Sequence, residues 1–249
     1  MMITDRPCSG SWFVFTGNHI GVLLASYIFD DIVPKERALR RAVLTSAVST
    51  VMLEKMALSH GIRFKETLTG FKWMANAAIS LREEEGVSTV FAFEEALGYM
   101  LPLVADKDGF SSALVFLAAE AKWRDQGLTV YGKLQELFRE FGHHETLNTY
   151  FRSPNPRVTM ALFAKIRNGP FQTEQKLGSF KILRWRDMTQ GYDSQTSDKK
   201  PVLPVDSSSQ MLTLWLDREV RFTLRASGTE PKVKCKIQSL SWSSLILNS

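Results

Sequence analysis

A short run of small and basic residues near the C-terminal end carries the clearest chemistry in the sequence. A run of apolar, strand-forming residues ends at an arginine, which is followed by a turn of small residues and then by a lysine. These residues are Arg225, then Ser227, Gly228 and Thr229, and then Lys232. Backbone N–H groups and two hydroxyls in such a turn can point at one anion. The arginine offers a planar fork that matches phosphate oxygens, and the lysine adds a point charge. Ser-Gly-Thr also occurs in plain turns, but the flanking basic residues favour a phosphate-binding loop.

Two adjacent carboxylates follow a second apolar run. Residues 87–93 are mostly β-branched and aromatic, which predicts a buried strand, and Glu94 and Glu95 come next. Ligands of open α/β sheets bind where strands end at their carboxyl side. Because consecutive strand residues face opposite ways, we expect one of the two to reach a ligand and the other to meet a backbone group or a basic partner. The same pair also fits an ordinary strand exit with solvated acids.

A third candidate segment lies between a predicted strand and a predicted helix. Thr69 and Gly70 follow residues 62–67 and precede residues 71–85, whose apolar positions have helical spacing. A glycine there lets a sugar approach the backbone closely, and Lys72 can reach a phosphate or a hydroxyl. Taken alone, a Thr-Gly pair at a helix start is weak evidence for a ligand-binding site.

The elements that must hold these residues alternate between strand and helix. Asn18 and Asp108 are typical N-caps. Strands are predicted over 11–15, 40–45, 62–67 and 87–93, and helices over 19–29, 47–60, 71–85, 109–124 and 129–141. This alternation predicts an α/β/α domain with a mixed, mainly parallel sheet over residues 11–126.

The pattern changes in the second half. Asn155 and Pro156 predict the start of a helix that ends near Gly169. Strands follow over 179–186, 211–216, 220–225 and 233–238. A helix and a run of strands predict a smaller α+β domain with an antiparallel sheet over residues 145–239.

Composition limits the class of protein. The 249 residues carry a net charge of +5. The first 125 residues hold 13 Lys/Arg and 15 Asp/Glu, and the rest hold 18 and 11, so the second half suits an anionic partner. Cys8 and Cys235 have no metal-ligand spacing, which favours a reduced, cytoplasmic location. His143 and His144 lack nearby partners for zinc. No run approaches the ~20 apolar residues of a membrane span.

Three motifs together resemble the sugar-binding and phosphate-binding loops of the α-D-phosphohexomutase family. They are TLTGFKW at 67–73, FEEALGY at 93–99 with DKDG at 106–109, and RASGTEPK at 225–232. The resemblance is closest to the phosphoglucomutase/phosphopentomutase branch and covers most of residues 11–238. It corresponds to the third and fourth domains of that family only.

The resemblance assigns roles to the candidate residues. It implies that Glu94 accepts hydrogen bonds from ring hydroxyls and that the Thr69–Gly70 loop distinguishes the two ends of a sugar phosphate. It places Lys107 near the phosphate to be transferred, although this residue also fits a solvated loop lysine. The loop from Arg225 would hold the phosphate that is not transferred. Ala96 stands where related phosphoglucomutases often have a serine, so strict glucose selectivity is in doubt.

By resemblance, the parent reaction moves a phosphate between C1 and the terminal hydroxyl of an aldose, through a phosphoserine and a sugar bisphosphate. The implied partners are glucose 1- and 6-phosphate and ribose 1- and 5-phosphate. The family's Ser-His-Asn-Pro loop and its aspartate loop for Mg²⁺ have no counterpart in this sequence. We therefore expect no catalytic residue and no Mg²⁺ ligands here, and a fragment that is inactive alone.

Two other functions remain open at this stage. The chain can be a non-catalytic sugar-phosphate-binding module, which the presence or absence of the serine and aspartate loops in the source transcript would decide. Nucleic-acid binding through the basic second half is disfavoured, because its charges are spread over strands and loops without aromatic residues between them. We expect neither a nucleic acid nor a membrane as partner.

Overall fold

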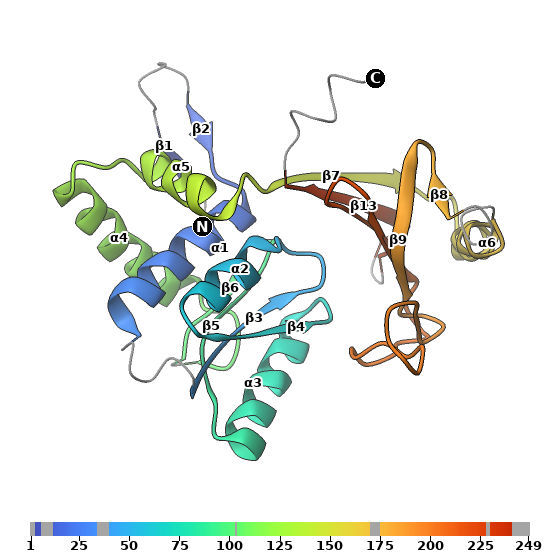
Figure 1. The fold of residues 1–249 in the computed structure, drawn as a ribbon, viewed down its shortest axis with the longest axis horizontal. Coiled ribbons are helices and arrows are strands. Elements are labelled where there is room, and N and C mark those ends of the chain that lie inside the picture. Colours follow the sequence, from blue (N-terminus) through green and yellow to red (C-terminus); the bar gives the residue numbers. More distant parts are fainter. Residues whose placement is uncertain are drawn as a thin grey trace. The chain divides into compact units, whose positions relative to one another are not determined.

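The computed structural model describes residues 3–5, 12–33, 40–102, 104–169, 175–227 and 230–240. The chain divides into two compact units, residues 1–143 and 144–249 (Figure 1). The first unit is α/β with a mixed sheet, and the second is α+β with an antiparallel sheet. The predicted fold class is therefore confirmed.

The first unit is built on a four-stranded sheet with the strand order β4-β3-β5-β6. Its strands are β3 (Arg41–Ser46), β4 (Arg63–Thr67), β5 (Ser88–Glu94) and β6 (Gly98–Met100). β3 runs parallel to both β4 and β5, while β6 returns antiparallel to β5. β6 was not predicted. A separate antiparallel pair joins β1 (Thr4–Asp5) to β2 (Phe13–Val14).

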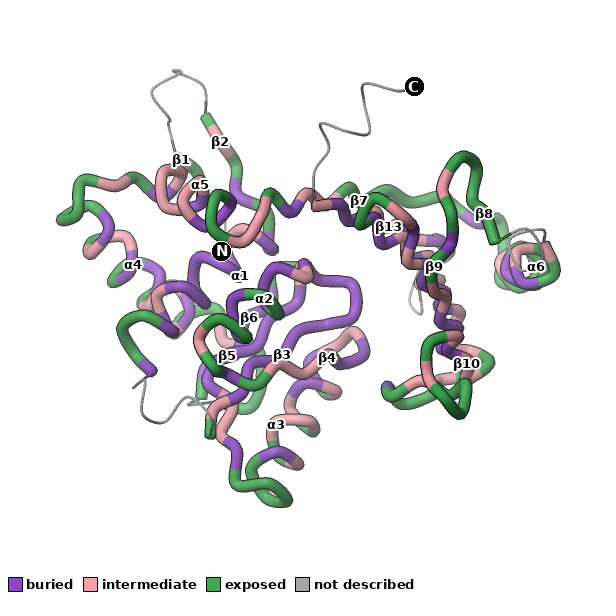
Figure 2. The backbone as a smooth tube through the Cα atoms, in the orientation of Figure 1, coloured by how far each residue is buried: buried purple, intermediate pink, exposed green. Residues whose placement is uncertain are grey.

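Alternation along the central strands places apolar side chains on both faces of this sheet. Ala42, Leu44 and Ala92 pack with α3 (Phe71–Glu85) on one face. Phe91 and Phe93 belong to the larger core on the other face. That core also contains residues of α1 (Gly17–Tyr27), η1 (Ile28–Ile32), α2 (Met52–Ser59), α4 (Gly109–Asp125) and α5 (Val130–Phe141). Burial on both faces explains why the central strands β3 and β5 read as largely apolar runs, whereas the edge strand β4 carries charged residues (Figure 2).

The helix starts of this unit show where cap prediction succeeds and fails. Asp108 caps α4 as predicted, because its carboxylate accepts from the Phe110 and Ser111 N–H groups. α1 is capped by Thr16 instead of Asn18, and His19 completes a capping box by accepting from the Thr16 N–H. The Asn18 side chain accepts from the Thr50 N–H, 3.0 Å away. α2 begins at Met52 and not at residue 47, because residues 47–50 form a turn.

The helix that follows residue 126, the predicted end of the first domain, packs into the core of the first unit. Val130, Leu134, Leu137 and Phe138 of α5 are buried in the larger core. Their burial makes α5 part of this unit, which ends at His143.

The second unit is an antiparallel sheet of seven strands with one long helix. The order is β10-β9-β11-β12-β13-β7, and β8 pairs with β9. α6 (Pro156–Arg167) begins at the predicted cap, Asn155, and contributes Phe163 to the core of the sheet. The strands are β7 (Glu145–Arg152), β8 (Lys176–Leu177), β9 (Phe180–Asp187), β10 (Tyr192–Asp193), β11 (Met211–Leu216), β12 (Val220–Ala226) and β13 (Lys232–Ser239). β7, β8 and β10 were not predicted.

A buried ion pair fixes α6 to β9. Arg167 donates to both carboxylate oxygens of Asp187, and its third nitrogen donates to Gln210 Oε1 at 2.7 Å. Both charges are almost fully removed from water, so the loss of either would leave the other uncompensated. Among the described residues, no helix combines the length and apolar character needed to cross a membrane.

Candidate functional site

In the first unit, the predicted site residues lie where the parallel strands end. The carboxyl ends of β3, β4 and β5 share one edge of the sheet because the three strands run in the same direction. Residues 68–70 follow β4, and Glu94 is the last residue of β5. This is the edge at which open α/β sheets bind ligands.

Glu94 is the centre of this site. Its side chain is only 7% exposed, and the Lys107 Nζ lies 2.8 Å from its Oε1. Its Oε2 accepts from the Gly70 N–H at 3.2 Å. The carboxylate thus lies at the N-terminus of α3, where the helix dipole favours a negative charge. The structure brings Gly70, Glu94 and Lys107 into contact with one another.

Gly70 and Thr69 provide backbone and hydroxyl groups beside this carboxylate. Gly70 is the N-cap of α3 with φ 114° and ψ 136°, a conformation that requires glycine. Thr69 Oγ1 is buried and has no hydrogen-bond partner among the described residues. A buried hydroxyl without a hydrogen bond is costly, so this side chain lies in an unfavourable environment.

Lys107 is held by the loop that starts α4. The Asp108 N–H donates to the Tyr99 carbonyl of β6 at 2.9 Å, and the Tyr99 hydroxyl donates to the Gly17 carbonyl at 3.2 Å. Burial raises the pKa of the Tyr99 phenol, which therefore stays a neutral donor. Hydrogen bonds from the Ser111 hydroxyl and from backbone N–H groups lower the pKa of Asp108, which keeps this cap ionised. These contacts fix the backbone that directly follows Lys107.

Two further residues at this edge make other contacts. One of the two glutamates was expected to meet a backbone group or a basic partner, and Glu94 meets both; Glu95 Oε2 accepts from the Ser46 and Ser49 hydroxyls, each at 3.3 Å. Nothing in the spacing of these serines pointed to that contact. Lys72 is exposed and its Nζ lies 5.3 Å from the centre of the Trp73 ring, which differs from the contact made by Lys107.

The predicted phosphate loop lies in the second unit, between β12 and β13. Arg225 is in β12, directly opposite Lys234 of β13. The Ser227 N–H donates to the Lys232 carbonyl at 2.8 Å, and the Glu230 N–H donates to Ser227 Oγ at 3.3 Å. Gly228 and Thr229 lie outside the described residues. The described ends of the loop form a tight turn that places Arg225, Ser227 and Lys232 at one end of the sheet.

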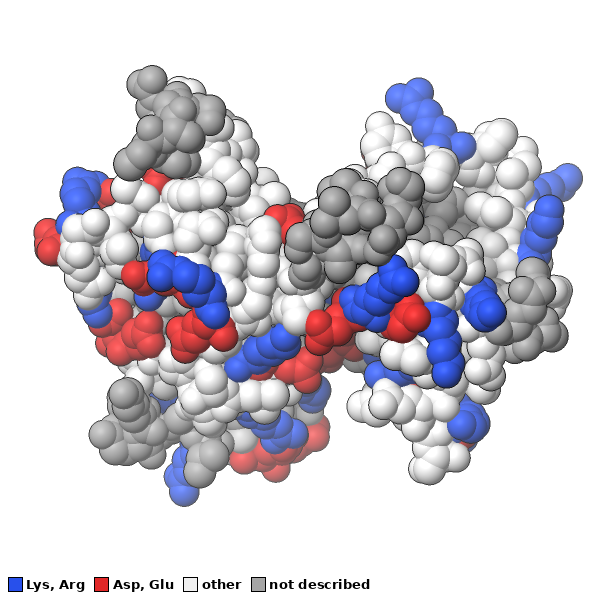
Figure 3. Space-filling model, turned by 45° about the horizontal axis from the view of Figure 1, so that its top comes forward, with Lys and Arg blue, Asp and Glu red and all other residues white. Residues whose placement is uncertain are grey.

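Strand alternation gathers cations on one face of this sheet, which the sequence analysis did not foresee. The residues on that face of β12 and β13 include Arg221, Arg225, Lys232, Lys234 and Lys236. Like charges directly opposite each other on neighbouring strands repel, so an anion bound at Arg225 and Lys234 would stabilise the pair. In Figure 3 most of the visible surface of this unit is uncharged, and its charged patches are more often Lys or Arg than Asp or Glu. The alternation Lys232, Lys234, Lys236 was the available signal.

The metal predictions concern both units. Among the described residues, no three His, Cys, Asp or Glu side chains gather into a group that could hold a metal ion. The described residues therefore do not fit a Mg²⁺ site, and we assign no step to a metal here.

The comparisons with known proteins agree with this architecture. The family described as phosphoglucomutase/phosphomannomutase, alpha/beta/alpha domain III, matches residues 16–141. A phosphoribomutase from Saccharomyces cerevisiae is 41% identical over 249 residues, which cover 93% of this chain and 40% of that protein. A phosphopentomutase from Homo sapiens is 39% identical, with 94% of this chain and 39% of that protein covered.

Two further comparisons extend this picture. A glucose 1,6-bisphosphate synthase from Homo sapiens is 37% identical and covers 91% of this chain and 37% of its own length. The open form of the Paramecium phosphoglucomutase parafusin superposes with a TM-score of 0.63 at 21% identity, over 91% of this chain and 37% of that one, which shows a shared fold. The chain spans about two fifths of the length of the curated relatives it matches.

Proposed function

The chain belongs to the phosphoglucomutase/phosphomannomutase family, and on this premise we propose that it is the substrate-holding part of a phosphoglucomutase/phosphopentomutase-type enzyme. The parent activity interconverts sugar 1-phosphates with sugar 5- or 6-phosphates. The contact that carries this proposal is the one that joins Glu94, Gly70 and Lys107. It presents hydroxyl acceptors and a cation at the carboxyl edge of the sheet.

The three groups have complementary roles toward a sugar phosphate. A carboxylate has about four lone-pair sites, and Glu94 uses one for Gly70 and one for Lys107, which leaves capacity for sugar hydroxyls. The Lys107 ammonium attracts the phosphate to be transferred. In the second unit, Arg225, Ser227, Gly228, Thr229 and Lys232 would hold the other phosphate.

The chain's own residues bind and orient the sugar phosphate, and they do not donate a phosphate. The phosphoserine and Mg²⁺ loops of the family would have to come from polypeptide that is not in this sequence. We place the activity in the cytoplasm, in line with the cysteine usage. Sugar phosphates are the proposed partners, and the exclusion of nucleic acid stays a prediction.

Calorimetric titration of the chain with ribose 5-phosphate and glucose 6-phosphate tests the binding role. Free ribose and sulfate, at constant ionic strength, are the controls. We expect both sugar phosphates to bind more tightly than either control, and Glu94→Gln to weaken the sugar phosphates more than sulfate. Equal affinity for sulfate and the sugar phosphates would show that the site recognises charge alone.

A coupled assay with glucose 1-phosphate and a bisphosphate activator tests the division of labour. We expect no turnover by the purified chain. Turnover that persists through purification would contradict the proposal, because a phosphate donor would then be present in this chain. Sequencing the source transcript for the serine and aspartate loops decides between the enzyme and a non-catalytic binding module.

A further inference from the structure

The aromatic ring of Phe71 lies beside the Lys107 ammonium. Lys107 Nζ is 5.1 Å from the centre of the ring and 2.8 Å from Glu94 Oε1. Phe71 is the first residue of α3 and is 6% exposed, whereas the Lys107 side chain is 51% exposed. A buried ring thus forms one wall for a lysine that otherwise extends into solvent.

Gly98 shows how closely these groups converge. A Cβ on Gly98 would lie 2.4 Å from Phe71 Cε2, 3.0 Å from Glu94 Cγ and 3.1 Å from Lys107 Cε. Three side chains from α3, β5 and the loop before α4 therefore surround one glycine of β6. Only a residue without a side chain leaves room for the ring, the carboxylate and the lysine stem together.

The ring and the carboxylate hold Lys107 in different ways. A cation near the face of an aromatic ring is attracted by the ring quadrupole. A lysine side chain has many rotamers, and an exposed ion pair alone orders it weakly. A sugar that takes hydroxyl contacts to Glu94 shares the carboxylate with Lys107, whereas the face of the ring stays with Lys107 alone.

We propose that Phe71 is a positioning residue that holds the Lys107 ammonium at the sugar-phosphate site through the face of its ring. Its effect on ligand binding rests on the proposed function, whereas its contact with Lys107 does not. In the ligand-bound chain the ring keeps the ammonium near the sugar phosphate while Glu94 bonds to sugar hydroxyls.

The competing explanation is that Phe71 serves only the core. It packs in the smaller core with Ala42, Leu44 and Met74. An aliphatic side chain of similar size would fill that role, whereas only a ring can attract the ammonium. Phe71→Leu and Phe71→Met keep the apolar contact, and Phe71→Tyr keeps the ring, so this series separates the two roles.

The contact is tested by NMR of the chain after reductive methylation of its lysines with ¹³C-formaldehyde. Lys107→Arg identifies the Lys107 signal. We expect an upfield ring-current shift of that signal in the parent chain and in Phe71→Tyr, and its loss in Phe71→Leu. The Lys72 signal, which is near Trp73, should not change across the series. An unchanged Lys107 signal in Phe71→Leu would overturn the proposal; if this variant does not fold, Phe71→Met takes its place.

The consequence is tested by calorimetric titration of the unmethylated variants with ribose 5-phosphate. We expect Phe71→Leu to weaken binding about two- to fivefold, which is the range of a cation–π contact at an exposed site, and Phe71→Tyr to restore it. Loss of the ring-current shift with unchanged affinity would overturn the positioning role alone. Absence of binding by the parent chain would overturn the proposed function, and the positioning role with it.

Discussion

Lys107 and Glu94 form an ion pair in which one partner is half exposed and the other is nearly buried. The pair joins the loop before α4 to the end of β5, and Gly70 adds a backbone N–H to the same carboxylate. A buried carboxylate without such partners would be costly. The charge of Glu94 is therefore compensated before any ligand binds, and a ligand has to share this carboxylate with Lys107.

Gly98→Ala should destabilise the first unit and disturb this ion pair. The added methyl group would lie 2.4 Å from the Phe71 ring, and overpacking of this kind costs about 1–3 kcal/mol. Hydrogen exchange of peptides from β5 and α3 in increasing urea measures the effect. Gly109→Ala is the matched control, because a Cβ there meets no atom within 4 Å. Equal stability of the two variants would show that the Phe71 ring can move away at no cost.

Arg225→Ala should weaken binding of any sugar phosphate, with the loss concentrated on the phosphate. A charge-assisted hydrogen bond contributes roughly 1.5–3 kcal/mol, so affinity should fall ~10- to 100-fold. The measurement is a titration with ribose 5-phosphate at constant ionic strength. Arg157→Ala removes the same charge from α6, on an exposed position outside the loop, and should leave affinity unchanged. If Arg225→Ala binds ribose 5-phosphate as tightly as the parent chain does, the loop is a plain turn and not a phosphate-binding loop.

The first unit should lose stability in mild acid through His19. Burial, and secondarily the charge of His143, lowers the pKa of His19 to about 4. Between pH 6.5 and pH 4 the unfolded chain binds a proton at His19 that the folded chain does not. Falling pH therefore favours unfolding over this range, by up to about 3 kcal/mol.

His19→Gln tests this dependence. A glutamine at the third helical position can still accept from the Thr16 N–H and keeps the capping box. The urea midpoint of unfolding is monitored by hydrogen exchange of α1 peptides. It should change less between pH 7 and pH 5 in this variant than in the parent chain. The same pH dependence in both chains would assign the acid sensitivity to other groups.

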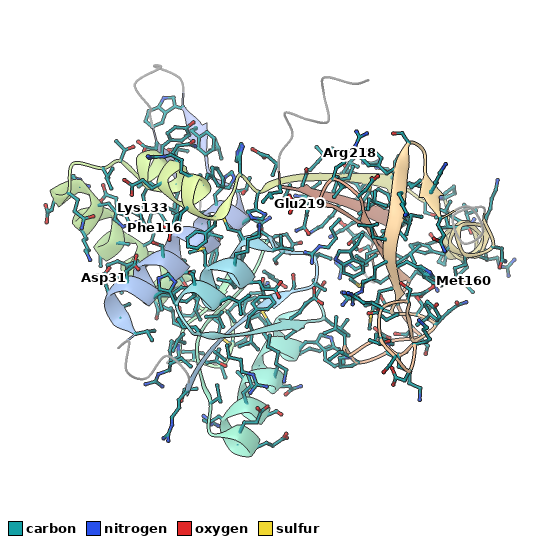
Figure 4. The ribbon with its side chains drawn as sticks, viewed as in Figure 1. Asp31, Phe116, Lys133, Met160, Arg218 and Glu219 are labelled. Atoms are coloured by element: carbon teal, nitrogen blue, oxygen red, sulfur yellow. The ribbon has the colours of Figure 1, made fainter. Side chains whose placement is uncertain are left out.

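The turn between β11 and β12 should be stabilised by glycine. Arg218 and Glu219 both have φ 56°, and Figure 4 labels their side chains at this turn. This conformation costs a non-glycine residue about 1–2 kcal/mol, and the extra freedom of glycine in the unfolded chain offsets about 0.5–1 kcal/mol. Glu219→Gly should raise the free energy of unfolding of the second unit by about 1 kcal/mol. Glu84→Gly, inside α3, should instead lower that of the first unit by a similar amount.

The long, periodic elements were predictable from local sequence. Residues 71–85 form a helix over the predicted range because the apolar spacing is regular and Gly86 ends it in a left-handed conformation. Asp108 and Asn155 cap their helices as predicted. Asn18 and Thr16 are both good caps, and only a contact with Thr50 decides that Asn18 has another role. Strand β7 was missed because its residues are largely exposed and show no alternation.

Local sequence predicted which candidate residues follow the strands, but not the contacts that they make with one another. The strand ends placed Gly70 and Glu94 at one edge, as the direction of parallel strands requires. The ion pair with Lys107 depends on the three-residue strand β6, which returns beside β5 and brings Gly98 opposite Glu94. A strand that short has no periodicity, so the sequence pattern gave no signal for β6 or for its pairing with β5 across residues 95–97.

Ala96→Ser should improve binding of a hexose phosphate relative to a pentose phosphate. Ala96 is exposed in the turn between β5 and β6, two residues after Glu94. A six-carbon sugar presents hydroxyls that a five-carbon sugar lacks, and a serine there can bond to one of them. One neutral hydrogen bond contributes ~0.5–1.5 kcal/mol, so the ratio of affinities should shift several-fold at most. Titrations of the parent chain and of Ala96→Ser with glucose 6-phosphate and ribose 5-phosphate give this ratio. Ala118→Ser, on the exposed surface of α4, is the control. An unchanged ratio in Ala96→Ser would mean that the backbone of the turn sets the preference.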